Sequence, residues 1–198
     1  LNTAILALVT AIKAQATAKN DVSSASPDPT VTYSAINGAH ARFGDRSGNP
    51  VAEVMTGGMY HRLIGKNLDN DQRLFTAGNV NVVDILGKAV IVTDAPALTT
   101  YTSPYTYDNV LSLAEGAATV FDGGDVISNV ETTNGKNRIE TTLQVDYTFG
   151  LSLKGYTWDE STGGKSPTNS DLSSAGNWDK VSSDIKNTAG VITIGKVV

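Results

Sequence analysis

Residues 139–153, IETTLQVDYTFGLSL, decide the fold, because apolar and polar side chains alternate along them. A strand points successive side chains to opposite faces, so the pattern predicts one extended strand with an apolar face and a polar face. At about 3.3 Å per residue such a strand spans on the order of 50 Å, whereas a usual strand has roughly 5–6 residues. We therefore expect an elongated body that reaches a neighbouring molecule. The apolar members are Ile139, Leu143, Val145, Tyr147, Phe149, Leu151 and Leu153.

The sequence before this stretch predicts two further strands beside it. Residues 110–122 (VLSLAEGAATVFD) and 126–133 (VISNVETT) have a strand-like composition and are separated by a Gly-Gly pair. Asn134-Gly135 follows, and this dipeptide tolerates positive φ at both turn positions, which is typical of a tight β-hairpin. We expect three antiparallel strands that lie side by side.

The N-terminal part predicts two helices. Residues 1–15 (LNTAILALVTAIKAQ) carry apolar side chains at helical spacing, and we expect this amphipathic helix to extend to about Asn20. It opens without Met and without an N-cap, so we expect that a longer protein precedes Leu1. After a Pro-containing loop at 23–30, Thr32 or Ser34 should cap a second helix that ends near Phe43.

The rest of the chain predicts short strands, a third helix and polar loops. The third helix should begin after Thr56-Gly57-Gly58, and residues 67–78 and much of the chain beyond Tyr156 read as loop. The expected strands are 51–55, 80–83, 88–93, 99–108 (an extended edge) and 191–198.

Composition excludes several classes of protein. The net charge is −5 and the basic residues are scattered, which argues against a dedicated nucleic-acid binder. There is no cysteine, so disulfides and thiolate metal sites are excluded. No apolar run reaches the roughly 18 residues that cross a bilayer, and we expect no membrane partner.

No motif in the sequence predicts an enzyme or a cofactor. Gly164-Lys165-Ser166 lacks the first glycine of a phosphate-binding loop, because residue 159 is Asp. His40 and His61 fall in two different expected helices, and we interpret both as surface or interface residues. The carboxylates of Asp122 and Asp125 are interpreted as turn residues, and Asp159 with Glu160 offers a second possible carboxylate pair. We expect no catalytic residue, no bound metal and no cofactor.

In their order along the chain, several segments resemble a known family. VAEVMTGGMYHRLIG (51–65), GKAVIVTDAPAL (87–98), VLSLAEGAATVFDGG (110–124), LSLKGYTW (151–158) and SPTNSDLSSAGNWDKV (166–181) are similar to the C-terminal two thirds of tailed-phage major capsid proteins with the Hong Kong 97 type fold. The resemblance covers nearly the whole chain.

The resemblance implies an α+β fold with two lobes. Residues 1–20 and 108–155 would form the peripheral lobe, with a spine helix and a long hairpin sheet, and residues 21–107 and 156–198 would form the axial lobe. The N-terminal arm and extended loop of the family are not present in this chain.

The resemblance also implies a function without catalysis. Copies of the chain would assemble into hexamers and pentamers of an icosahedral capsid, located in the virion and assembled in the host cytoplasm. Scaffold, portal or cement proteins are possible partners, and packaged double-stranded DNA would be enclosed without sequence specificity.

Two segments are candidates for subunit contacts. Tyrosine offers a large contact area with a polar tip, so we place Tyr101, Tyr105 and Tyr107 at an interface. The polar loop at 67–78 is the second candidate, and its charged residues are Asp69, Asp71 and Arg73.

Two other functions remain open from the residues alone. A secreted or surface β-rich glycan-binding module fits the high Ser, Thr and Gly content, with Trp158 and Trp178 as exposed anchors. A hydrolase that uses a pair of carboxylates is the other alternative, and it requires a cleft.

Overall fold

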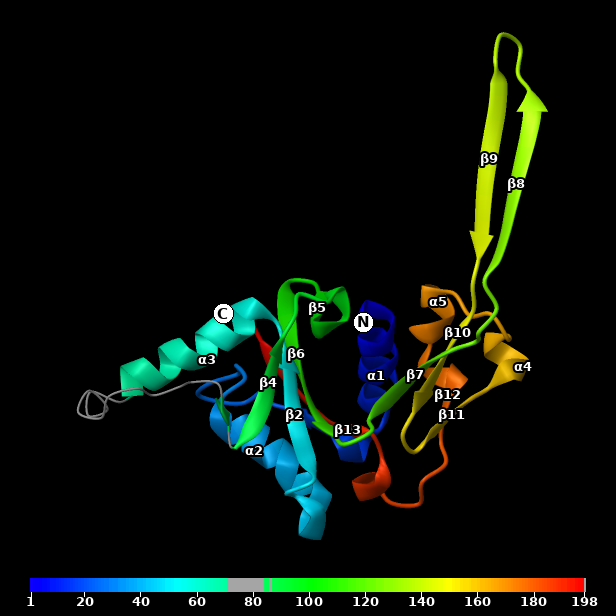
Figure 1. The fold of residues 1–198 in the computed structure, drawn as a ribbon. Coiled ribbons are helices and arrows are strands. Elements are labelled where there is room, and N and C mark those ends of the chain that lie inside the picture. The colour runs from blue at the N-terminus through cyan, green and yellow to red at the C-terminus, as the bar shows by residue number, and fades with distance from the viewer. Residues whose placement is uncertain (71–83, 86, 198) are drawn as a thin grey trace. The chain divides into compact units, whose positions relative to one another are not determined.

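The structure is a computed structural model that describes residues 1–70, 84–85 and 87–197 (Figure 1). The chain is mixed α+β, with several sheets and few helices. Its contacts divide it into two compact units, Leu1–Ala118 with Leu153–Val198, and Thr119–Ser152. These limits differ from those of the two predicted lobes, whose assignment stays a prediction.

A mixed sheet forms the centre of the first unit. Two pairs of strands are parallel, β1 with β13 and β2 with β4, and the other pairs are antiparallel. Leu111 of β6 lies opposite Ile192 of β13, and both are fully buried. The strand order is β1 (Lys19–Asp21), β13 (Gly190–Lys196), β6 (Tyr105–Ala114), β2 (Pro50–Met55), β4 (Lys88–Val92) and β3 (Asp84–Ile85), while β5 (Thr99–Thr102) pairs with β6.

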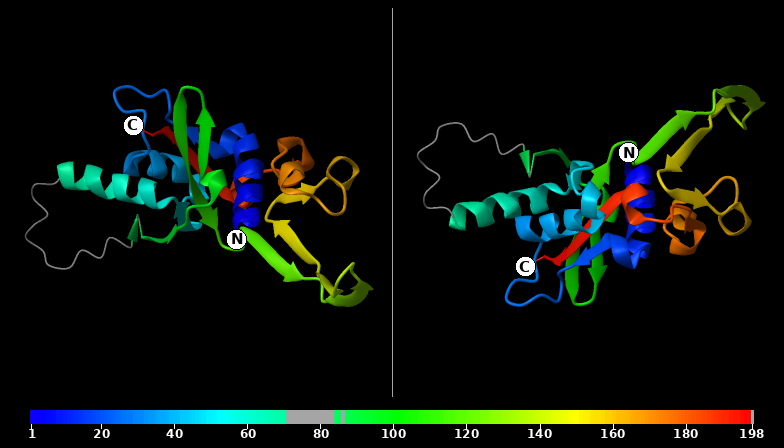
Figure 2. Two further views of the ribbon diagram at one scale, coloured as in Figure 1. Left: turned by 90° about the horizontal axis from the view of Figure 1, so that it is seen from above. Right: turned by 90° about the horizontal axis from the view of Figure 1, so that it is seen from below.

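Helices cover both faces of this sheet. Figure 2 shows α1 (Asn2–Ala14) on one side and α2 (Tyr33–His40) and α3 (Gly57–Asn70) on the other. On the α2 and α3 side, Ile36, Met59 and Leu63 form a buried cluster with Met55 and Val110 of the strands. Strand alternation gives each face its own apolar set, which is why a sheet of this kind is buried from both sides.

The predicted N-terminal helices are confirmed, with a change of length. In α1 the residues at helical spacing, Ile5, Leu8 and Ile12, are at most 3% exposed. The helix ends at Ala14, whereas we expected it to continue to Asn20, because residues 19–21 pair with β13 as a strand. Thr32 caps α2, since its Oγ1 accepts from the Ala35 amide at 3.1 Å.

The strand and helix predicted between 51 and 65 are confirmed as β2 and α3. The polar loop was expected from residue 67, but α3 continues to Asn70. Residues 71–78 and the strand predicted at 80–83 lie outside the described residues. The strands predicted at 88–93 and 191–198 are confirmed as β4 and β13.

The segment after Tyr156 contains short elements around two tryptophans. The rings of Trp158 and Trp178 meet edge to face, with centroids 4.9 Å apart, and Trp178 is only 5% exposed. The expectation that both tryptophans are exposed is therefore wrong for Trp178, whose indole donates to the Leu172 carbonyl at 3.2 Å. The elements are β11 (Tyr156–Trp158), α4 (Glu160–Gly163), α5 (Asn169–Leu172) and β12 (Trp178–Lys180).

The second unit contains residues 139–152 of the alternating stretch 139–153. Its strands are β7 (Ala118–Asp122), β8 (Ile127–Asn134), β9 (Ile139–Asp146) and β10 (Phe149–Leu153). β8 pairs with β9, and β7 pairs with β10. The hairpin predicted at Asn134-Gly135 is confirmed, although its last pair is Asn134 with Ile139, so the loop is wider than a two-residue turn.

The single long strand predicted for 139–153 is wrong, because it is interrupted at 147–148. Across from that break, the Gly123 amide donates to the Thr148 carbonyl at 2.9 Å, and the Gly124 amide donates to Asp122 Oδ1 at 3.0 Å. The paired segment thus changes direction opposite the break, and a strand ends where its paired strand ends. The prediction of three strands side by side is also wrong, since the strands form two separate pairs.

Candidate assembly surface

One face of the β8–β9 hairpin carries most of the hairpin's large apolar side chains. Directly opposite residues in an antiparallel pair share a face. The register places Val130 opposite Leu143 and Ser128 opposite Val145 on one face. Glu131 opposite Thr142 lies on the other. The alternation seen in the sequence therefore becomes two chemically different surfaces.

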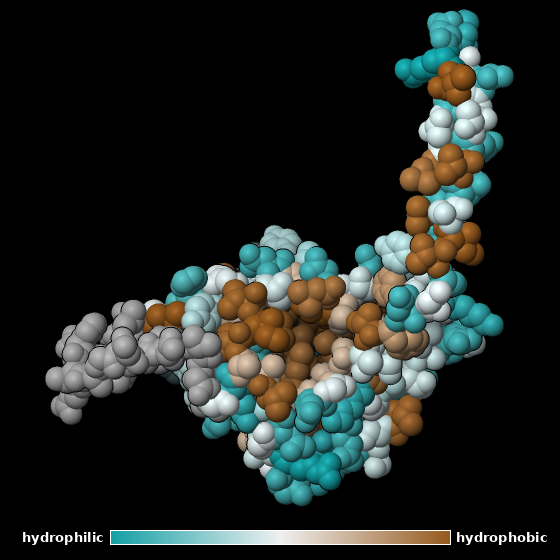
Figure 3. All heavy atoms as spheres, in the orientation of Figure 1, coloured by the Kyte–Doolittle hydropathy of each residue, from teal (hydrophilic) through white to brown (hydrophobic). Residues whose placement is uncertain are grey.

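The apolar face is uncovered. Every residue of β8 and β9 is exposed, and Figure 3 shows hydrophobic side chains recurring along the hairpin. The large apolar side chains of this face, with Val126 just before β8 and Tyr147 just after β9, are Val126 (69% exposed), Val130 (63%), Ile139 (70%), Leu143 (66%), Val145 (47%) and Tyr147 (67%).

Such a hairpin has little to stabilise it within the chain. An isolated two-stranded hairpin is marginally stable in water, and three strands or a covering layer are needed. The described residues supply no third strand beside β8 or β9, so both outer edges also present unpaired backbone groups. A large uncovered apolar face of this kind marks an interaction surface.

Aromatic side chains are also exposed at the base of the hairpin. Phe121 and Phe149 are 55% and 56% exposed, and the rings of Tyr147 and Phe149 stack with centroids 6.4 Å apart. Gly150 lies beneath the Phe121 ring, because a Cβ at this position would come within 2.0 Å of the ring carbon Cζ. Aromatic residues are enriched at the centres of protein interfaces.

The three predicted interface tyrosines lie in one hairpin, β5–β6, but in different surroundings. Tyr101 is 70% exposed. The ammonium group of Lys196 lies 4.1 Å from the centroid of the Tyr105 ring, and Tyr107 lines a cavity beside α1. Tyr101 is therefore the member most available to a partner, and the interface role of all three stays a prediction.

The charged candidates at 69–73 are not placed by the structure. Asp69 lies in α3, and the structure describes only its backbone. Asp71 and Arg73 lie outside the described residues. The β8–β9 face, in contrast, was not among the predicted interface residues, although its alternation was visible in the sequence.

A comparison with protein families decides the kind of protein. The family model described as Gp13-like, major capsid protein 13-like, matches residues 1–192. The chain belongs to this family. It is therefore of the phage major capsid protein kind, with a structural role in the capsid shell of the virion. A search of curated proteins found no match.

A buried polar network lies in the core of this capsid protein. Nε2 of His40 lies 2.6 Å from Oε1 of Glu53, and the Ser112 hydroxyl donates to Oε2 of Glu53 at 2.7 Å. His40 is 5% exposed and the other two are fully buried. The interpretation of His40 as a surface residue is therefore wrong, whereas His61 is exposed.

The network does not have the arrangement of a nucleophile and its base. In that arrangement a hydroxyl is hydrogen-bonded to the imidazole, but here the carboxylate separates Ser112 from His40. The sequence contained a signal for this network that we did not use, because Glu53 interrupts the apolar run of a buried strand. A buried carboxylate needs a partner.

Other ion pairs connect the elements of the first unit. Arg62 of α3 pairs with Asp108 of β6, and burial raises the pKa of this aspartate, while Arg62 opposes that shift. Lys66 of α3 pairs with Asp28, and this hydrogen bond, with those from Thr30, lowers the pKa of Asp28 to about 2. These pairs attach α3 to the sheet and to the loop before α2.

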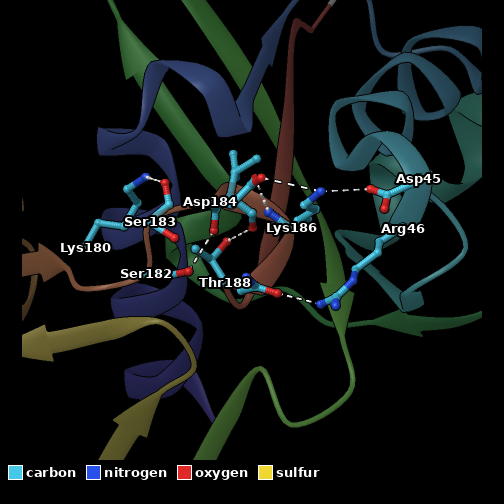
Figure 4. Close-up of polar contacts among 10 residues, drawn as sticks. Asp45, Arg46, Lys180, Ser182, Ser183, Asp184, Lys186 and Thr188 are labelled. Atoms are coloured by element: carbon cyan, nitrogen blue, oxygen red, sulfur yellow. Dashed lines mark hydrogen bonds and ion pairs between the residues drawn. The ribbon is translucent and has the colours of Figure 1, made fainter.

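A surface cluster joins two short 3₁₀ segments, Ala41–Arg46 and Ile185–Asn187 (Figure 4). Nζ of Lys186 lies 3.0 Å from Oδ1 of Asp45 and 3.6 Å from Oδ2 of Asp184. Arg46 donates to Oδ1 of Asn187 at 2.5 Å. The pKa of Lys186 is raised, chiefly by its hydrogen bond to Asp45. Each of these four charges has an opposite or polar partner, so the cluster connects the two segments and leaves no unpaired charge.

The candidate carboxylate pairs cap local structure. Asp159 Oδ1 accepts from the Ser161 amide at 2.9 Å at the start of α4, and Asp122 accepts within the turn at 122–125. Among the described residues there is no group of three or more His, Cys, Asp or Glu side chains that could hold a metal ion. No helix in the described part of the chain is long and apolar enough to cross a membrane.

Proposed function

We propose that this chain is a shell subunit that assembles with copies of itself into the hexamers and pentamers of an icosahedral capsid enclosing double-stranded DNA. The observation that carries the proposal is the uncovered apolar face of the β8–β9 hairpin. A subunit of a closed shell must bury surface against its own copies, and symmetry then fixes how many copies meet.

A second copy is the partner that fits this face best. The chain belongs to a family of major capsid proteins, and a shell built from many copies of one protein places those copies next to each other. Each large apolar side chain that becomes fully buried stabilises the contact by about 1.5–3 kcal/mol. Several such contacts around each subunit stabilise a shell even where each single contact is weak.

The Hong Kong 97 type fold remains part of this proposal. The resemblance in the sequence, the family match and the combination of a helix-covered sheet with an exposed hairpin support it. In that fold residues 1–20 and 108–155 serve as the peripheral lobe, and residues 21–107 and 156–198 serve as the axial lobe. Assembly takes place in the host cytoplasm, with scaffold, portal or cement proteins as further partners.

The role is structural, and the enclosed DNA is bound without sequence specificity. The net charge of −5 gives the subunit little general attraction for a phosphate backbone. DNA would therefore be confined by the shell and remain free to leave it.

The proposal is tested with a double variant of the apolar face, Val130→Thr with Leu143→Thr, in the full protein. The matched control alters the directly opposite pair on the polar face, Glu131→Gln with Thr142→Ser. We expect the apolar-face variant to remain folded and to lose closed particles in size-exclusion chromatography and negative-stain microscopy, while the control assembles normally. If both variants assemble as the natural protein does, the proposed role of this face is wrong.

A further inference from the structure

A cavity of about 270 Å³ lies in the first unit where α1 ends above the sheet. Lys13 projects from the last turn of α1, and Lys19 from β1. Thr100 and Thr102 of β5 and Tyr107 of β6 contribute hydroxyl groups to the lining. With the hydroxyl of Ser23 and the carboxylate of Asp21, the lining holds two cations, one anion and four hydroxyls.

Lys13 is half-buried and has no acidic partner. Its ammonium group donates to Oγ1 of Thr100 at 3.3 Å, and none of the ion pairs in the described part of the chain includes it. Burial lowers the pKa of Lys13, and repulsion from Lys19 lowers it further, although Asp21 opposes the shift. A partly desolvated ammonium group without a carboxylate is costly unless an anion accompanies it.

Lys19 of β1 lies on the face of the sheet that is covered by α1. Its Cα partner in the parallel register is Ile192, and that of Asp21 is Ile194, so both side chains point to the α1 side together with those isoleucines. Lys19 forms no hydrogen bond or ion pair with any side chain that the structure describes. Asp21 also lines the cavity, and its Oδ1 accepts from the amide and the hydroxyl of Ser23 at 3.1 and 2.6 Å, so this single carboxylate offsets only one of the two lysine charges.

The Thr100 hydroxyl adds a directed donor. It accepts from Lys13 and also from Nδ2 of Asn109 at 2.8 Å. The amide orientation of Asn109 is fixed by a second bond, from the same Nδ2 to the Ala97 carbonyl at 3.1 Å. Because both contacts use the oxygen of Thr100 as acceptor, its hydroxyl hydrogen is left to donate.

The balance of positive and negative charge around this cavity differs from that around a larger cavity beside α3. There Arg62 and Lys66 pair with Asp108 and Asp28, and Lys196 lies over the Tyr105 ring. In the cavity beside α1 two ammonium groups, those of Lys13 and Lys19, face one carboxylate, that of Asp21, so the lining has an excess of positive charge. A site with excess positive charge attracts an anion.

We propose that this cavity binds a phosphate-type oxyanion, held by the ammonium groups of Lys13 and Lys19 and by the Thr100 hydroxyl. Lysine is a compact point charge with rotatable donors, and with hydroxyls it suits a tetrahedral anion better than a planar carboxylate, for which arginine is the preferred partner. The phosphate group can come from free inorganic phosphate or from a nucleic-acid backbone. The site is independent of the proposed shell function, because the cavity lies within one chain.

The test is isothermal titration calorimetry of the unassembled full chain with inorganic phosphate at constant ionic strength, with chloride as the reference salt. The variants are Lys13→Gln, Lys19→Gln and Thr100→Val, and the control is Lys165→Gln, which removes the same charge from an exposed position. We expect saturable phosphate binding by the natural chain and by the control. Lys13→Gln and Lys19→Gln should each weaken binding about tenfold or more, since a hydrogen bond to a charged group is lost.

A second measurement separates binding from folding. Acetylation of lysines, mapped by mass spectrometry, should show that phosphate protects Lys13 and Lys19 and leaves Lys165 unprotected. The same protection of lysines is measured with a short double-stranded DNA oligonucleotide in place of free phosphate. Protection by DNA at lower concentration than by free phosphate assigns the backbone as the source, and protection by free phosphate alone assigns the small anion. Lack of saturable binding by the folded natural chain, equal binding by Lys13→Gln, or protection of Lys13 only when copies assemble would each overturn the proposal.

Discussion

Val130 of β8 lies directly opposite Leu143 of β9, and the two side chains are 63% and 66% exposed. Leu111 of β6 lies opposite Ile192 of β13 in the same kind of antiparallel pairing, and both are fully buried. The chain therefore contains one sheet that is stabilised by layers within its own unit, and one hairpin whose apolar pairs gain that stabilisation only from a partner.

Hydrogen exchange should distinguish these two sheets. In the unassembled protein we expect the amides of β8 and β9 to exchange much faster than those of β6 and β13, because local opening of an uncovered hairpin costs little free energy. After assembly the β8 and β9 amides should slow by about tenfold or more. Mass spectrometry of peptides from both states measures this, and unchanged exchange in the hairpin after assembly would contradict its role as a contact.

Tyr101 provides a second test of assembly. Replacement of Tyr101, Tyr105 and Tyr107 by Ser should impair assembly more than folding. Because Tyr101 is 70% exposed while the other two have contacts within the chain, Tyr101→Ser alone should give most of the effect. Its melting temperature should match that of the natural protein. Equal yields of closed particles from Tyr101→Ser would remove this residue from the interface.

His40→Ala should destabilise the fold strongly. The substitution leaves the buried Glu53 carboxylate without its closest partner, and breaking a buried pair in this way costs about 3–5 kcal/mol. His61→Ala is the matched control, because His61 is exposed, and it should change the free energy of unfolding by less than about 0.5 kcal/mol. Denaturant unfolding measures both. Similar effects of the two variants would show that the network contributes little.

Local patterns in the sequence predicted much of the fold. The spacing of Ile5, Leu8 and Ile12 predicted α1, the choice of Thr32 or Ser34 as cap predicted the start of α2, and Asn134-Gly135 predicted a hairpin. Each of these signals acts between residues that are close in sequence, so one chain segment is enough to recognise it.

Features that depend on distant partners were missed. The alternation of 139–153 could not show that the paired segment turns at 122–125 and that the strand ends opposite this turn. The pairing of β6 with β13, the contact of His40 with Glu53 and the meeting of Lys13 with Lys19 each join different elements. Periodicity within one segment carries no information on which elements meet.

Gly190→Ala should destabilise the central sheet. A Cβ at Gly190 would lie 2.3 Å from the backbone oxygen of Ser112 and 3.1 Å from Cα of Leu113, so β13 and β6 would have to separate. Overpacking of this kind typically costs about 1–3 kcal/mol. Gly176→Ala is the control, because nothing lies within 4 Å of its added Cβ. Thermal unfolding followed by circular dichroism compares them, and equal melting temperatures would contradict the close approach of the two strands.

The ion pair between Asp28 and Lys66 should contribute to stability in a limited range of pH. The hydrogen bond from Lys66, with those from Thr30, lowers the pKa of Asp28 to about 2 in the folded state, whereas an unfolded aspartate titrates near about 3.9. A depressed carboxyl pKa gives stability that is present above the unfolded value and is lost as pH falls through the folded value.

The Lys66→Met variant tests this range directly. Both side chains are more than one third exposed, at 35% for Lys66 and 43% for Asp28, so solvent screening keeps the contribution of the ion pair below about 1 kcal/mol. We expect the variant to be less stable than the natural chain by that amount at pH 7, and the difference to disappear as the pH falls from about 4 to about 2. Denaturant unfolding at several pH values measures the difference. A difference that stays constant down to the lowest pH would assign the effect to packing of the Lys66 side chain instead of its charge.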